Sequence, residues 1–181
     1  PKLFNLPDNA ELSAKYQTIV TPAGFAFAIW GLIFLMQLIW SIVQFVLPAI
    51  RTNPLVVKGV GYNYIWVCAF QVAWTFSFAL EQISLSLFCM LGILLFLIRI
   101  YSTQQKVLEE YANVESSFTK NYWLLRFPFG LHLGWITAAT LVNANVVLVA
   151  HNDVFTARPQ FYAAMLSLAF TLGVTAGTLF Q

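Results

Sequence analysis

The chain has 181 residues, of which 60% are hydrophobic and only 9% are charged. A mean hydropathy of +0.75 leaves too little polar surface to coat a water-soluble globule, so a soluble protein is excluded. The six tryptophans, seven tyrosines and seventeen phenylalanines instead fit helices that pack within a bilayer. The net charge is +2 and the nine Lys and Arg residues are scattered, so no basic patch indicates nucleic-acid binding.

The first part of the chain, residues 1–22, predicts an extramembrane N-terminal arm. Its opening PKLFNLPDNAELSAKYQ carries mixed charge and no long apolar run, unlike a secretory signal or a spanning helix. The chain starts at Pro1 without a methionine, which leaves an upstream targeting or processed segment open.

Residues 23–181 predict an all-α membrane protein, a single domain with a bundle of about five transmembrane helices. Apolar runs alternate there with polar or glycine-containing loops, and Glu81 and Gln82 form a tight polar turn. The segment 99–126 holds most of the charge and predicts a helix-prone stretch outside the membrane. The predicted spans are 23–47, 62–80, 83–100, 127–150 and 161–179.

Lysine and arginine are unevenly divided between the two predicted sides of the membrane. One side has six Lys and Arg residues and the other has three. This difference favours an orientation in which the side with six faces the cytosol, or the stroma or matrix of an organelle. We therefore expect a multi-pass protein of an organellar membrane, plastid thylakoid or mitochondrial, or of a bacterial inner membrane. The six are Arg51, Lys58, Arg99, Lys106, Lys120 and Arg126, and the three are Lys2, Lys15 and Arg158.

Polar side chains inside the predicted spans are candidates for ligand contacts, because an unpaired polar group is costly in lipid. His132, Trp135 and Asn143 follow the three-to-four-residue spacing of one helix face. One interpretation is hydrogen bonding between helices. The alternative is a groove that contacts the metal or a carbonyl of a tetrapyrrole. The predicted ligand-binding residues are His132, Trp135, Asn143, Trp30, Gln37 and Trp74.

Small residues recur four apart in the last two predicted spans, a spacing that lets helices approach closely. The first interpretation is packing within the bundle, and the alternative is a docking face for another membrane subunit. The residues that form this pattern are Gly130, Gly134, Ala138, Ala169, Gly173 and Gly177.

The sequence offers no catalytic arrangement. It has two histidines, its seven acids lie almost wholly outside the predicted spans, and no nucleophile has a nearby base. Cys68 and Cys89 fall in apolar runs without the short spacings of a metal site. We therefore expect a protein that is not an enzyme and has no metal site of its own.

Two blocks of sequence combine aromatic, glycine and proline residues in a recognisable order: KYQTIVTPAGFAFAIWGLIF and YWLLRFPFGLHLGWITAATLVNANVVLV. They resemble the tryptophan-rich sensory protein branch of the TspO/MBR (translocator protein) family, in a divergent form. The resemblance implies a five-helix membrane protein that binds porphyrins or other flat apolar molecules, with roles in tetrapyrrole handling, stress signalling or transport. The matching residues are Thr21, Pro22, Gly24, Phe27, Ile29, Trp30, Gly31, Arg126, Pro128, Phe129, Gly134, Trp135, Ala139 and Asn143.

These observations lead to two hypotheses of different classes. The first is a non-enzymatic membrane protein that binds a flat hydrophobic ligand, a tetrapyrrole such as porphyrin, haem or chlorophyll. The second is a structural accessory subunit that links a larger membrane assembly, such as a photosystem-antenna supercomplex, with His132 or His151 as axial ligands of chlorophyll. A small-molecule transporter ranks last, because no acidic residue inside a span offers a proton relay. The expected partners are membrane lipids, a hydrophobic small molecule and other membrane subunits.

Overall fold

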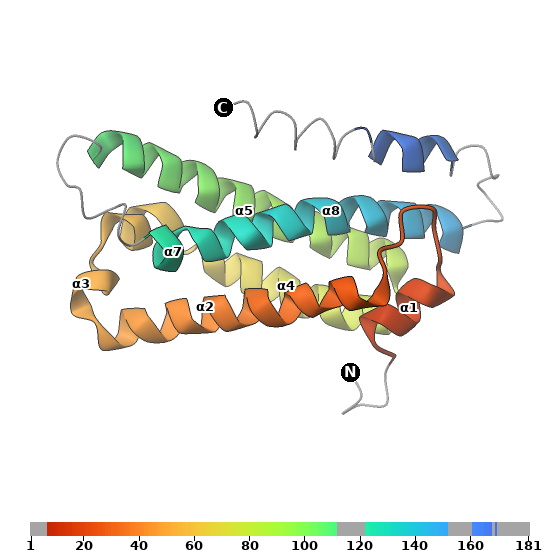
Figure 1. Ribbon diagram of the computed structural model, residues 1–181, viewed down its shortest axis with the longest axis horizontal. Helices are drawn as coiled ribbons and strands as arrows, with labels where there is room; N and C mark the ends of the chain where they lie inside the picture. Colours follow the sequence, from red (N-terminus) through yellow and green to blue (C-terminus); the bar gives the residue numbers. More distant parts are fainter. Residues whose placement is uncertain (1–6, 112–121, 152–160, 168, 170–181) are drawn as a thin grey trace. The chain divides into compact units, whose positions relative to one another are not determined.

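A computed structural model describes residues 7–111, 122–151, 161–167 and 169. Every regular element in these ranges is a helix, as Figure 1 shows. The elements are α1 (Asn9–Lys15), the 3₁₀ helix η2 (Gly24–Ala28), α2 (Ile29–Val46), α3 (Pro48–Arg51), the π-helix η3 (Leu55–Val60), α4 (Asn63–Ala79), α5 (Ile83–Tyr111), α7 (Tyr122–Leu125) and α8 (Phe127–Ala150).

Three helical segments in the described ranges are long and apolar enough to cross a membrane. They are Gly24–Val46, Ile83–Tyr111 and Phe127–Ala150. The prediction of an all-α membrane protein is therefore confirmed. Helix α4 occupies most of the predicted span 62–80, and residues 161–167 begin a further helix where the fifth span is predicted. Most of that fifth span lies outside the described residues, so the number of five remains a prediction.

Helix α5 is longer than the span that the hydropathy pattern predicts. The prediction ends at residue 100, whereas the helix continues to Tyr111. Leu, Gln, Lys and Glu after Arg99 are good helix formers, and neither Gly nor Pro interrupts them. At 1.5 Å per residue, 29 residues rise roughly 44 Å, more than a hydrocarbon core of roughly 30 Å. The first part of the predicted polar segment 99–126 is therefore the end of a spanning helix.

The fold divides into two compact units. Unit 1 comprises Pro1–Phe27, Val72–Met90 and Thr137–Gln181, and unit 2 comprises Ala28–Gln71 and Leu91–Ile136. The unit boundaries fall within η2, α4, α5 and α8, so each of these helices contributes to both units. The predicted division into an arm over 1–22 and a membrane domain over 23–181 stays a prediction.

Unit 1 holds the N-terminal arm against the turn between α4 and α5. Helix α1 begins with a capping box, in which the Asp8 carboxylate accepts from the Glu11 backbone N–H and Glu11 accepts from that of Asp8. At its end, Lys15 and the Tyr16 hydroxyl both donate to the Glu81 carboxylate. Glu81 has a left-handed backbone with φ of 59°, as a tight turn of this kind requires. The predicted turn at Glu81 is thus also the point where the arm is attached.

Unprotonated Glu81 is expected to hold the arm, and acid is expected to release it. The hydrogen bond from Lys15, followed by that from Tyr16, lowers the pKa of Glu81 below its ordinary 4.5. A lowered pKa in the folded state means that the contact is complete above pH 4.5 and is lost as the pH falls through the lowered value. We therefore expect hydrogen-exchange protection factors of the α1 amides to fall at acid pH and in a Glu81→Gln variant, while those of α8 stay unchanged. Equal α1 protection in the variant and the wild type would contradict this attachment.

Unit 2 buries one stripe of α2 and leaves the opposite face open. Trp30, Ile33, Gln37 and Trp40 recur at three- and four-residue intervals and are buried. The outward positions carry large apolar side chains, which suits a helix surrounded by lipid. These exposed residues of α2 are Leu32, Phe34, Leu35, Leu38, Ile39, Ile42, Phe45 and Val46.

Close helix packing in unit 2 depends on glycines that the small-residue pattern did not select. A Cβ added at Gly92 of α5 would lie 2.6 Å from the Phe70 ring of α4, and one at Gly59 would lie 2.8 Å from Gln104 Cγ. At Gly130 the nearest atom, on Tyr101, is 3.4 Å away, and at Gly134 none lies within 4 Å. Gly130 therefore makes an ordinary contact and Gly134 none, while Gly173 and Gly177 lie outside the described residues. Packing at Gly134 is not required among the described residues, and docking there remains a prediction.

Replacing Gly92 by Ala is expected to destabilise the protein by about 1–3 kcal/mol, because the added methyl overlaps the Phe70 ring and α4 and α5 must separate. Gly134→Ala is the matched control, since its methyl meets open space and Ala is the better helix former by roughly 1 kcal/mol. Thermal unfolding of both variants in the same detergent measures the difference. A melting temperature of Gly92→Ala at or above that of Gly134→Ala would refute the close approach.

Candidate functional site

The candidate site lies in unit 2, where the buried stripe of α2 meets α8. Phe129 and His132 face this stripe from α8, and both are almost completely buried. The ring centroids of Trp40 and Phe129 are 5.0 Å apart, and those of Trp30 and His132 are 5.9 Å apart. Both pairs meet edge to face, which is the favoured geometry for aromatic rings. The two helices are therefore held together by aromatic contacts on either side of Gln37.

A chain of polar groups crosses this aromatic interface. Gln37 Nε2 lies 2.8 Å from His132 Nδ1, and the Tyr64 hydroxyl of α4 lies 3.3 Å from Gln37 Oε1. His132 is only 1% exposed and Gln37 only 5%. The chain satisfies both ends of the Gln37 amide, as a buried amide in lipid requires. We refer to His132, Gln37, Tyr64, Trp30 and Trp135 as the His132 centre.

The second ring nitrogen of His132 is buried and has no hydrogen-bond partner among the described residues. With Gln37 Nε2 as the donor, Nδ1 accepts, so the neutral ring carries its proton on Nε2. Rotation of the Gln37 amide by half a turn would reverse this arrangement. Gln37 Oε1 would then accept from His132 Nδ1–H, and His132 Nε2 would present a lone pair. The Tyr64 hydroxyl can donate or accept, so it suits both orientations. His132 Nε2 can therefore donate to a carbonyl or carboxylate, or bind a metal ion.

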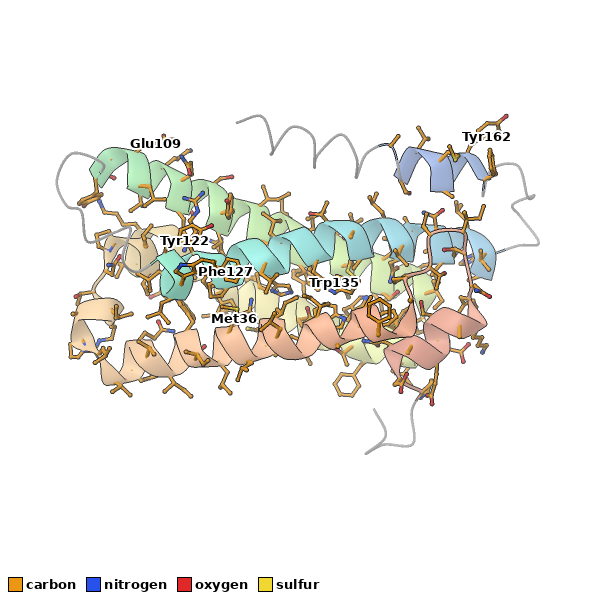
Figure 2. The ribbon with its side chains drawn as sticks, in the orientation of Figure 1. Met36, Glu109, Tyr122, Phe127, Trp135 and Tyr162 are labelled. Carbon is orange, nitrogen blue, oxygen red and sulfur yellow. The ribbon has the colours of Figure 1, made fainter. Side chains whose placement is uncertain are left out.

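Two tryptophans belong to the His132 centre, with Trp30 packed edge to face against both His132 and Trp135. The ring centroids of Trp30 and Trp135 are 6.0 Å apart at an interplanar angle of 85°. Figure 2 shows Trp135 projecting from α8 on the side of α2. Trp30 is 7% exposed, whereas Trp135 is half-buried and forms the outer wall. Two large flat rings beside a histidine provide apolar contact area around one polar point.

The structure brings four of the six predicted ligand-binding residues into the His132 centre: His132, Trp135, Trp30 and Gln37. The other two belong to unit 1 and make different contacts there. The Asn143 amide exchanges hydrogen bonds with the Ser86 hydroxyl, at 3.2 and 3.3 Å. Trp74 stacks on Phe78 with centroids 5.4 Å apart.

The second candidate axial ligand, His151, lies at the end of α8 and is exposed. Its Nδ1 is 2.9 Å from the Val147 carbonyl oxygen, so Nδ1–H donates to the helix and Nε2 faces outward. The two histidines thus occupy opposite environments, one buried between helices and one at a helix end.

Sequence reasoning missed Tyr64, Trp40 and Phe129. Trp40 and Phe129 lie three residues from Gln37 and His132, so extending each helical stripe by one position would have identified them. Tyr64 gives no such signal, because it lies on a third helix whose rotation the sequence does not fix.

Metal-binding side chains do not gather in the described ranges, where no group of three or more His, Cys, Asp or Glu residues could hold an ion. Cys68 is exposed, Cys89 is buried, and both are free thiols.

The fold and the site define a multi-pass helical membrane protein with a histidine buried between aromatic residues. A family model described as TSPO-like protein matches residues 2–181. The chain therefore belongs to the TSPO-like protein family, and the resemblance drawn from its two sequence blocks is confirmed. No curated protein and no solved structure matches the chain.

Replacing Gln37 by Leu is expected to lower stability by about 1 kcal/mol, because His132 and Tyr64 would both lose their buried hydrogen-bond partner. Gln44→Leu, farther along the same helix at a half-buried position, should be neutral or slightly stabilising. Unfolding in mixed micelles at increasing SDS fraction measures both changes. A Gln37→Leu variant as stable as Gln44→Leu would show that the polar chain contributes nothing.

Proposed function

We propose that the chain binds a flat hydrophobic molecule, a tetrapyrrole such as porphyrin, haem or chlorophyll, at the His132 centre. The observation that carries the proposal is the buried Nε2 of His132, which has no protein partner among the described residues. Leaving a buried polar group unpaired costs about 1–3 kcal/mol, and a ligand atom bonded to it would remove that cost.

The surroundings of this nitrogen suit a tetrapyrrole. Trp30 and Trp135 offer aromatic faces and edges for contact with a macrocycle. Because Trp135 is only half-buried, it is the wall that would move to admit a ligand from the lipid side. His132 then supplies the single directional contact, to a central metal or to a peripheral carbonyl or carboxylate, depending on the Gln37 orientation. One polar group within an apolar, aromatic lining is typical of sites for small hydrophobic molecules.

A second candidate function is that of a linking subunit in a larger membrane assembly, such as a photosystem-antenna supercomplex in a thylakoid. Gly134 supports this linking function, because the residue is exposed on α8 and has open space beside its Cα. A neighbouring helix could approach closely at such a point. Co-purification of the chain with that assembly would support the second function. It would not exclude the first, since a linking subunit can also hold pigment.

Haem and metal-free protoporphyrin IX, added to the purified protein in mild detergent, test the first function. We expect both to quench tryptophan fluorescence at saturating stoichiometry, because Trp30 and Trp135 lie within 6.0 Å of each other beside the site. His132→Ala should weaken haem binding at least about tenfold and shift the Soret band of the haem. The variant loses the bond from the imidazole to the haem iron, and we expect this bond to contribute more than about 1.4 kcal/mol, which corresponds to a tenfold change in Kd.

His151→Ala is the matched control, because it removes the exposed histidine and leaves the His132 centre intact. If only His151→Ala alters the Soret band, the site lies at the end of α8 and the assignment to His132 is wrong. If the wild type binds neither compound, the tetrapyrrole function is refuted and the linking function remains.

A further inference from the structure

Arg126 is a buried arginine at a helix junction in unit 2. It follows α7 and immediately precedes α8, and its exposed fraction is 6%. An arginine is always ionised, so its charge must be balanced where it is buried. The other buried polar side chains of this unit, such as Gln37 and Gln104, are neutral.

The direct partners of Arg126 are neutral, and the carboxylate linked to it through them is that of Glu109, which accepts from Gln105 Nε2 at 2.9 Å. Arg126 Nη2 donates to Gln105 Oε1 at 2.7 Å, and Arg126 Cζ lies 4.3 Å over the Tyr101 ring. Within the described ranges these neutral contacts are not accompanied by an ion pair, since the salt bridges there are Lys15 with Glu81 and Lys58 with Glu110. A guanidinium has five N–H donors, and the bond to Gln105 uses one. The chain thus positions a planar donor group and leaves most of its hydrogen-bonding capacity for another molecule.

The location of Arg126 indicates where that molecule comes from. Trp123, 66% exposed, and Tyr122, 40% exposed, lie on α7 directly before it. Exposed Trp and Tyr at the end of a spanning helix mark the level of the lipid headgroups. Helix α8 begins at the next residue, Phe127, so its positive N-terminal end lies at the same level. An anion at headgroup depth would meet the guanidinium as its main donor, because in the first turn of α8 Pro128 has no N–H and the N–H groups of Phe129 and Gly130 donate to the Arg126 carbonyl.

We propose that Arg126 binds the phosphate of a membrane phospholipid. Phosphate oxygens match the fork of guanidinium N–H groups in a bidentate arrangement, which a lysine ammonium cannot form. The Tyr101 ring and the Gln105 side chain orient the fork, and the aromatic residues of α7 contact the lipid at its glycerol and upper acyl region. A free phosphate ion has the same oxyanion chemistry, and the experiment separates the two sources.

The test uses the full chain in a zwitterionic detergent. Phosphatidylglycerol or inorganic phosphate is added, and thermal unfolding and native mass spectrometry are recorded. A ligand that binds only the folded state raises the melting temperature, and the rise grows with the logarithm of the ligand concentration divided by Kd once the site is saturated. We expect phosphatidylglycerol to raise the melting temperature of the wild type and to remain bound as one molecule. In Arg126→Gln the half-saturating lipid concentration should rise at least about tenfold, because a charge-assisted bidentate contact is lost.

Arg99→Gln is the matched control, since Arg99 is an exposed arginine on the neighbouring helix α5 and stacks on Phe96. It should respond to lipid as the wild type does. Arg126→Lys keeps the positive charge and loses the forked donor group, so a lipid affinity between those of the wild type and Arg126→Gln supports bidentate binding. If Arg126→Gln does not fold, Arg126→Lys replaces it, and weaker lipid binding than in the wild type is expected. A response to inorganic phosphate as large as that to lipid would overturn the lipid source. Equal lipid affinity in the wild type, Arg126→Gln and Arg126→Lys would overturn the site itself.

Discussion

The hydrogen bond between Gln37 and His132 fixes the register of two helices in unit 2. A polar side chain in a membrane span has no water to bond with, so it needs a hydrogen-bond partner on another helix. The position of that partner determines how the helix is rotated. Once Gln37 faces His132, the three- and four-residue spacing on each helix places Trp40 against Phe129 and Trp30 beside His132. A rotation of either helix by one residue would separate the polar pair and turn the tryptophans toward lipid. The aromatic lining of the centre is thus a consequence of one polar contact.

The polar groups of the described chain fall into a consistent scheme. Several neutral groups in the helices are paired across helices, as with Ser86 and Asn143 or Asn145 and Ser167. Charged groups are paired at the ends of helices, where Lys58 meets Glu110 and Tyr111 and where Lys15 meets Glu81. His132 Nε2 and the Arg126 guanidinium are buried and retain unused hydrogen-bonding capacity. Trp40 Nε1 and Gln104 Oε1 are also buried without a hydrogen-bond partner in the described ranges, but neither can bind a metal ion, and neither carries a charge. Departures from an otherwise satisfied pattern are the places where a binding function is expected.

Much of the fold follows from the sequence because hydropathy and helix-breaking residues act locally. Helix α8 occupies 127–150 as predicted, and α2 with η2 fills most of the span predicted over 23–47. The extension of α5 could not be read from hydropathy, because polar helix formers continue a helix after its apolar part has ended. His132, Gln37 and Trp30 could be selected because polar or aromatic residues at spacings within one helix are visible in the sequence. Tyr64, Gly92 and the contact of Gly59 with Gln104 could not, since they depend on which faces of different helices meet.

The length of α5 also bears on the thickness of the bilayer that suits this chain. Its apolar part, residues 83–100, rises about 27 Å, slightly less than an average hydrocarbon core of roughly 30 Å. The helix then continues through the charged residues Lys106, Glu109 and Glu110, which favour water over hydrocarbon, so tilting would shorten an already short apolar part. Such hydrophobic mismatch costs fractions of a kcal/mol per Å and sorts proteins between membranes. In a bilayer thicker than this apolar part, the lipids around α5 would have to compress.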